Sequence, residues 1–190
     1  LHLVNNGELI ASTELEIYIF PHVSPQVSTR HIYSPEFHPL LKHLGYDSAD
    51  DLSQADVAVV TTLDDAGREF LLRGGKVLLL AEEDNALQTY IPGIGIEPRR
   101  GTPWQGDWAS SFGWHKFASI PTDGVVGFAF ADLTPEHVIG GLAPRDFARD
   151  VYAGLFVGWL HKPIPTIARK RLGRGELLVS TFRLARNLEN

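Results

Sequence analysis

The chain contains neither cysteine nor methionine in its 190 residues. Without cysteine it can form no disulfide, hold no thiolate-bound metal and use no thiol as a nucleophile. The missing thiols leave the compartment unassigned, because a protein without them suits oxidising and reducing surroundings alike. Methionine is missing even at position 1, and the first residues read as part of a strand, so we expect a fragment of a longer polypeptide.

Long apolar runs and an excess of positive charge are also missing. The apolar stretches fall well short of the roughly 20 residues that span a bilayer, and the N-terminus lacks the basic and then apolar segments of a signal peptide. The formal net charge of -6 gives no general attraction to phosphate backbones or anionic lipid. We therefore expect neither a membrane nor a nucleic acid as a partner.

The composition, with 44% hydrophobic and 21% charged residues, is that of an ordinary globular protein and excludes a fibrous chain. Two short apolar runs, Val57–Val60 and residues 77–80, flank the sequence LDDAGREFLLRGG. Each run is too short for a helix and lacks alternation, which indicates strands buried on both faces. The segment between them starts with Asp64 and Asp65 and ends with Gly74 and Gly75, as a capped helix does. This order predicts parallel strands in a layered α/β domain.

The same pattern begins earlier and returns near the end of the chain. Residues 28–33 read as a strand, and a helix is predicted over 35–44, capped by Ser34 and ended by Gly45. Periodicity fades over 85–134, which indicates either a functional loop or elements that the pattern does not reveal. Further strands are predicted over 137–140, 155–160, 165–172 and 176–182, the last two joined as an antiparallel hairpin through residues 173–175.

The first 26 residues differ in kind. Asn5, Asn6 and Gly7 predict a hairpin turn, and alternation over residues 14–20 indicates a half-buried antiparallel strand. The sequence PHVSPQVS, with two prolines and two serines, then indicates a linker over 21–26. We therefore divide the chain into residues 1–22, the end of a preceding β-sandwich domain with its linker, and residues 23–190, the α/β domain.

Several segments together resemble a known family. ELEIYIFP, DVAVVTT with LLRGGKVLLLAEE, RKRLGRGELLVSTFRL, TPWQGDWASSFGW and LARNLEN are similar to the C-terminal region of multidomain proteins related to glycoside hydrolase family 2, the β-galactosidase-like and β-mannosidase-like proteins. The resemblance implies a class I glutamine amidotransferase-like, or flavodoxin-like, accessory domain: three layers around a mostly parallel sheet, with an antiparallel C-terminal hairpin.

The resemblance also bears on catalysis. In amidotransferases of this fold a nucleophilic cysteine follows a strand like residues 77–80, and here Glu82 and Glu83 occupy that region. The glutamates of the related hydrolases would lie on an upstream barrel, so the resemblance implies no catalytic residue in this chain. The parent protein would be a glycosidase.

The first candidate site is the acidic run Glu82, Glu83 and Asp84 at the carboxyl end of a predicted strand, where open α/β sheets bind ligands. These carboxylates could act as acid, base or metal ligand. The alternative is a solvated acidic loop that helps to end the strand. Neighbouring side chains on a strand point to opposite faces, so the three cannot all converge.

The second candidate site is the aromatic stretch around Trp104, Trp108 and Trp114, with Asp107 between them. Flat rings present apolar faces to the C–H faces of sugars, and a carboxylate can hold sugar hydroxyls. The alternative is that these rings close the edge of the domain or contact a neighbour. Trp159, in a predicted strand, is interpreted as a core residue.

Other chemistries have little support. His38 and His43 are five apart, about 140° around a helix, and the other six histidines are single, so we expect no metal site and no cofactor. No G-x-S-x-G, G-x-G-x-x-G or P-loop motif is present. Three hypotheses follow: a noncatalytic accessory domain bordering a carbohydrate site, an independent carbohydrate-binding module, and a hydrolase that uses Glu82 or Glu83 with His115 or His137.

Overall fold

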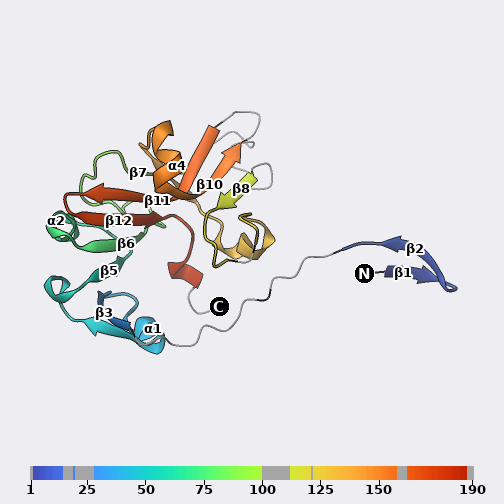
Figure 1. Ribbon diagram of the computed structural model, residues 1–190, viewed down its shortest axis with the longest axis horizontal. Coiled ribbons are helices and arrows are strands. Elements are labelled where there is room, and N and C mark those ends of the chain that lie inside the picture. Colours follow the sequence, from blue (N-terminus) through green and yellow to red (C-terminus); the bar gives the residue numbers. More distant parts are fainter. Residues whose placement is uncertain are drawn as a thin grey trace.

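The computed structural model describes residues 2–14, 19, 28–99, 112–120, 122–157 and 162–187. Most of the strands join one sheet, and the helices are short (Figure 1). The helices are α1 (His38–His43), α2 (Asp65–Arg73) and α4 (Phe147–Asp150), with 3-10 turns η1 (Leu52–Gln54), η3 (Phe128–Leu133), η4 (Pro144–Asp146) and η6 (Ala185–Asn187). The strands are β1 (His2–Asn5), β2 (Glu8–Ser12), β3 (Ser28–Tyr33), β4 (Tyr46–Ala49), β5 (Val57–Val60), β6 (Lys76–Leu80), β7 (Gly95–Pro98), β8 (Phe112–His115), β9 (His137–Gly140), β10 (Val151–Val157), β11 (Lys162–Leu172) and β12 (Gly175–Ser180).

The central sheet has eight strands in the order β4-β3-β5-β6-β12-β11-β10-β8. The strands from β4 to β12 in this order are parallel, and β11, β10 and β8 continue the sheet in antiparallel pairing. The predicted α/β class with a mostly parallel sheet is confirmed, and so is the antiparallel hairpin of β11 and β12. The antiparallel part is larger than predicted, because β10 and β8 extend it.

The predicted strand-helix-strand unit is β5, α2 and β6. The Asp64 carboxylate accepts a hydrogen bond from the Gly67 N–H at 2.8 Å, which caps the first turn of α2. Gly74 ends the helix in the left-handed region, with φ of 115°, where a side chain would be strained. The local chemistry of this unit is therefore readable from the sequence alone.

The first unit is β3, α1 and β4. The helix is shorter than the predicted 35–44, because residues 35–37 form a turn in which the Ser34 hydroxyl accepts the Phe37 N–H at 3.2 Å. Gly45 follows the helix with φ of 83°, as a C-terminal stop requires. The four residues of β4, YDSA, contain no apolar run, so periodicity does not predict this strand.

The main core lies between α2 and one face of the sheet. Leu71 of α2 is fully buried against Val77 and Leu79 of β6 and against Leu177 and Val179 of β12. The core is completed from residues 85–142, where β7 and β9 form a separate antiparallel pair. Residues 85–134 therefore contain the short strands β7 and β8, which the pattern does not predict, whereas β9 lies at the predicted residues 137–140.

β10 and β11 begin earlier than predicted. β10 begins at Val151 rather than at residue 155, and β11 begins at Lys162 although two prolines follow. Pro163 and Pro165 lie opposite Phe156 and Gly154 of β10. Residues 158–161, which include Trp159, lie outside the described residues.

The predicted N-terminal hairpin is confirmed as β1 and β2, which pair antiparallel around Asn6 and Gly7. Both turn residues have positive φ, 48° and 83°. Of the predicted strand over 14–20 and linker over 21–26, only residues 14 and 19 are described, and the division at residue 22 stays a prediction. Within the described ranges, no helix is long and apolar enough to cross a membrane.

Candidate functional site

Glu82 lies just beyond the carboxyl end of β6 and is 6% exposed. Its Oε1 accepts a hydrogen bond from the Ala185 N–H at 2.5 Å, and its Oε2 lies 3.5 Å from Nε of Arg186. The C-terminal residues reach this place because β12 runs parallel beside β6, so both strands end at the same edge of the sheet. Glu82 thus fixes the segment that follows β12.

The neighbouring carboxylates strengthen this attachment. Glu83, which is exposed, is ion-paired with Nη2 of Arg186. Glu136 lies 3.6 Å from Nη1 of Arg186 and 3.5 Å from Nη1 of Arg183. We term this group of five residues the C-terminal clamp: Glu82, Glu83, Glu136, Arg183 and Arg186. Their charges are largely paired with one another.

Burial raises the pKa of Glu82 because it disfavours the charged carboxylate. The Ala185 N–H and the charge of Arg186 act in the opposite direction. Oε2 is buried and no described group donates a hydrogen bond to it. Glu82 is therefore a carboxyl group kept in an unfavourable place by its role in the clamp.

Asp84 takes a separate partner. Its Oδ1 lies 3.1 Å from Nε2 of His137, which is 8% exposed. A carboxylate can only accept, so Nε2 is the donor in this pair. Glu82 and Glu83 thus share Arg186, whereas Asp84 pairs with His137, so the three carboxyl groups of the acidic run do not converge on one site.

The structure does not bring Glu82 or Glu83 to either histidine of the hydrolase hypothesis. The ring of His115 is buried, with Nε2 2.6 Å from the Thr122 hydroxyl and Nδ1 accepting the Phe117 N–H at 3.1 Å. Because Nδ1 accepts, Nε2 carries the proton and donates to Thr122. Burial also lowers the pKa of His115, in keeping with this neutral ring.

Trp114 is the one member of the predicted aromatic site within the described residues; Trp104, Asp107 and Trp108 lie outside them. It belongs to β8 and packs against the main core. A Cβ added to Gly154 of the adjacent strand β10 would come within 3.3 Å of the indole ring, so the ring lies over that glycine. The ammonium group of Lys116 is 5.5 Å from the ring centre. The ring of Trp114 therefore packs over Gly154 of the adjacent strand.

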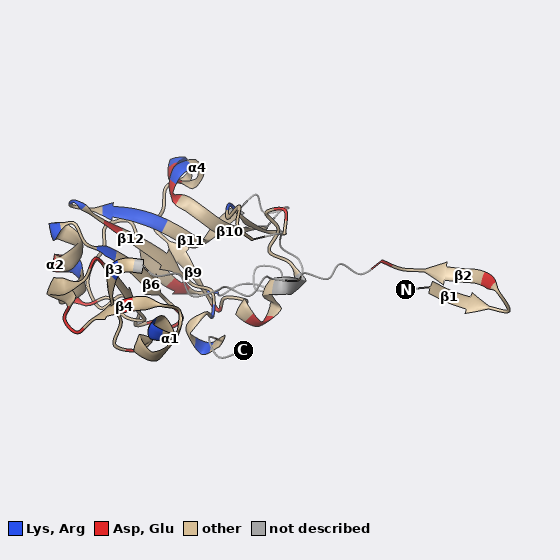
Figure 2. Ribbon diagram, turned by 60° about the horizontal axis from the view of Figure 1, so that its bottom comes forward, with Lys and Arg blue, Asp and Glu red and all other residues tan. Residues whose placement is uncertain are grey.

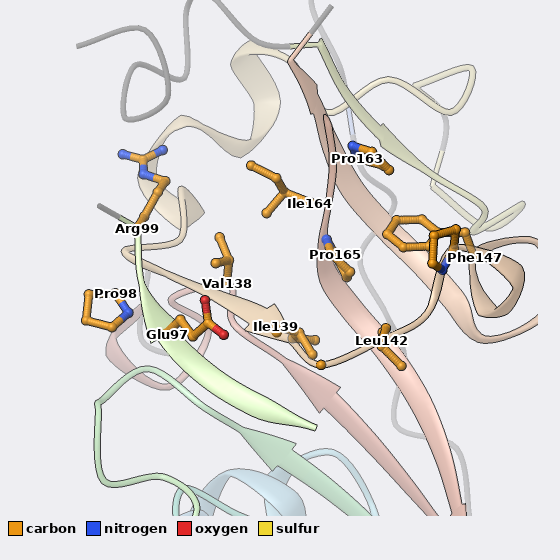
Figure 3. A pocket seen from close by; sticks show the side chains of 13 residues that line it. Glu97, Pro98, Arg99, Val138, Ile139, Leu142, Phe147, Pro163, Ile164 and Pro165 are labelled. Atoms are coloured by element: carbon orange, nitrogen blue, oxygen red, sulfur yellow. The ribbon is translucent and has the colours of Figure 1, made fainter. Parts of the chain in front are cut away.

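A large pocket lies beside this region, with a volume of about 720 Å³. Figure 3 shows β7 and β9 on one side of it and β11 with α4 on the other. Its polar side chains are Glu97 and Arg99 of the β7 end, and Phe147 supplies an aromatic ring from the opposite side. The apolar lining consists of Pro98, Val138, Ile139, Leu142, Pro144, Pro163, Ile164 and Pro165.

The polar groups of the pocket suit binding rather than bond cleavage. Glu97 can accept and Arg99 can donate hydrogen bonds to a polar ligand, while the ring and the prolines offer apolar contact. Among the described lining residues Glu97 is the one carboxylate, whereas glycoside hydrolysis uses a pair. A Cβ at Gly140 would collide with the Glu97 carboxylate, so this glycine gives Glu97 its position.

Sequence reasoning misses both the clamp and the pocket. The clamp joins residues about a hundred positions apart, which no local pattern reveals. Glu97 and Arg99 lie in the glycine-containing stretch GIGIEPRR, whose four-residue strand carries no periodic signal. Among the described residues, no group of three or more His, Asp or Glu side chains could hold a metal ion.

No protein-family model matches the chain, and no curated protein matches it.

Proposed function

We propose that this chain is a noncatalytic accessory domain of a glycoside hydrolase-like multidomain protein, built on a class I glutamine amidotransferase-like scaffold without its nucleophile. The observation that carries the proposal is Glu82. It lies just past β6, where the nucleophilic thiol of such a scaffold is expected. Its carboxyl group accepts a hydrogen bond from the Ala185 N–H and pairs with Arg186. A group held in this way has a structural role.

The strand order supports the finer fold assignment. Counted from β3, the parallel strands lie in the order 2-1-3-4, followed by the last strand of the chain, which is the flavodoxin-like order at its start. The crossover from β3 to β4 and that from β5 to β6 run in opposite directions across the sheet. Right-handed crossovers then favour α1 and α2 on opposite faces, which is a three-layer arrangement.

The pocket at Glu97 supports a contact with carbohydrate. A sugar ring could lie with its C–H face on Phe147 or the prolines, while its hydroxyls reach Glu97 and Arg99. With a single carboxylate, this pocket would border a substrate that another domain of the same polypeptide cleaves.

Binding and turnover test the two parts of the proposal. The chain should hydrolyse neither aryl glycosides nor glutamine. Galactose, mannose and their oligomers, titrated against its tryptophan fluorescence, should give a saturable change that Glu97→Gln weakens at least about 10-fold, equivalent to roughly 1.4 kcal/mol. Glu69→Gln, an exposed change on α2, is the matched control and should leave the titration as it is. Titrations that are flat for every sugar would remove the carbohydrate contact from the proposal.

A further inference from the structure

The two faces of the central parallel strands are covered to different degrees. Facing α2, Ala58 of β5, Val77 of β6 and Leu177 of β12 are at most 3% exposed. On the opposite face, the residues Val59, Leu78 and Leu178 lie side by side on the same three strands, because Val59 pairs with Leu78 and Leu78 with Leu178. All three are only half-buried. We term these three residues the central row.

The central row lies between two covered regions of this face. On one side, α1 packs against β4, and His38 of α1 is hydrogen-bonded to Ser48 of β4. Ser48 pairs with Ile32 of β3, and Ile32 pairs with Val57 of β5, so these three residues lie in one row across the sheet. Towards the carboxyl ends of the strands, Phe117, Phe130 and Phe182 pack with Ala153 of β10 and Ile167 of β11. The uncovered part of the face is therefore a strip over β5, β6 and β12.

An apolar pocket of about 330 Å³ continues this strip. Leu78, Leu178 and Ile167 are part of its floor, and Phe117, Phe130 and Leu184 are part of its wall. Parallel strands are rarely left open to water on one face. A half-covered strip that runs into an apolar pocket is thus suited to receive an apolar surface from outside the described residues.

The dimensions of the strip fit one helix. Three strands spaced about 4.8 Å apart give a row roughly 10 Å across, and a helix with its side chains is about 10–12 Å wide. Leucine-like side chains at helical spacing would meet the central row and enter the pocket.

The charges beside the strip would determine how an approaching helix is oriented. The next row towards the amino ends consists of Val57, Lys76, Glu176 and Arg171. Lys76 and Arg171 are exposed, while Glu176 faces Arg169 at 3.7 Å. Figure 2 shows the basic residues of β11 as one blue stretch. Carboxylates on the approaching helix would meet Lys76 and Arg171.

We propose that this strip is the docking surface for one amphipathic helix from a neighbouring domain of the same polypeptide, with its apolar stripe on the central row and its acidic residues beside Lys76 and Arg171. The proposal rests on the accessory-domain function and adds which surface of the domain meets its neighbour and which kind of element it receives.

The test uses the 190-residue chain and a fluorescein-labelled synthetic helix of roughly 18 residues, about 27 Å long, with leucines at positions i, i+3, i+4 and i+7 and glutamates along their border. Fluorescence anisotropy should show saturable binding. A peptide of the same composition with the leucine stripe scrambled should not bind, and one with lysine in place of glutamate should bind at least about 10-fold more weakly, equivalent to 1.4 kcal/mol.

Two variants of the chain locate the contact. Lys76→Glu combined with Arg171→Glu changes only exposed side chains and should weaken binding at least about 10-fold. Arg68→Glu combined with Arg73→Glu makes the same change in net charge on α2, which covers the other face, and should leave the affinity unchanged. Equal losses in both variants would show that only the overall charge is sensed and would overturn the proposal.

Two further outcomes would overturn it. One is the absence of saturable binding by the glutamate peptide. The other is a dimer of the chain in sedimentation velocity that Lys76→Glu with Arg171→Glu dissociates, because a second copy would then occupy the strip. Catalytic turnover is measured separately, so failure of peptide binding would leave the noncatalytic assignment intact.

Discussion

At the scale of single residues, Glu82 combines an energetically unfavourable burial of its carboxyl group with a structural role. Its carboxyl group is buried at the end of β6, one oxygen receives the Ala185 N–H, and the other faces Arg186. Burial without full hydrogen bonding is costly for a carboxylate. Its position is explained by the C-terminal clamp, in which Glu82 shares the attachment of the C-terminal segment with Glu83 and Glu136.

The raised pKa of Glu82 makes a prediction about pH. Its folded pKa lies above the value of 4.5 for the free group, so the native state holds the proton more tightly. The free energy of unfolding should then lose a component as pH rises from about 4.5 through the folded pKa. Urea unfolding between pH 4 and 8 should show this loss in the wild type and not in Glu82→Gln.

Glu69→Gln is the matched control, since Glu69 is exposed on α2 and is not part of the C-terminal clamp. It should keep the pH dependence of the wild type. Parallel pH profiles for the wild type and Glu82→Gln would show that burial does not raise the pKa of this group.

At the scale of elements, α2 carries its own start and stop signals. Asp64 caps its first turn and Gly74 its last, and Leu71 is buried on the face between them. Asp64→Ala should lower the free energy of unfolding by about 1 kcal/mol, because the Gly67 N–H loses its acceptor. Chemical denaturation measures this change, and Glu69→Ala, in the exposed middle of the helix, should cost less than about 0.5 kcal/mol. Similar losses from both substitutions would contradict the cap.

Elements with a strong local signal are those that the sequence predicts. β5, β6 and α2 combine apolar runs with caps, so they follow from the pattern, as does the glycine turn between β11 and β12. β4, β7 and β8 are four residues long, and their pairing partners decide that they are strands. The clamp and the pocket at Glu97 depend on contacts far apart in the sequence, which is why the acidic run could be identified but its partners could not.

At the scale of the whole molecule, the α/β body combines a fully covered core with a half-open opposite face. From the strand order and the buried Glu82 we propose an amidotransferase-like scaffold that serves as an accessory domain, with the half-covered strip as the surface that meets its neighbour. Both proposals assign the chain to a larger protein whose chemistry takes place elsewhere.

The most direct test of this account is the turnover of aryl glycosides and of glutamine by the purified chain, measured beside Glu82→Gln. The account predicts no hydrolysis above the uncatalysed rate by either protein, because Glu82 is committed to Ala185 and Arg186. Hydrolysis by the wild type that Glu82→Gln abolishes would make Glu82 a catalytic residue and contradict the account.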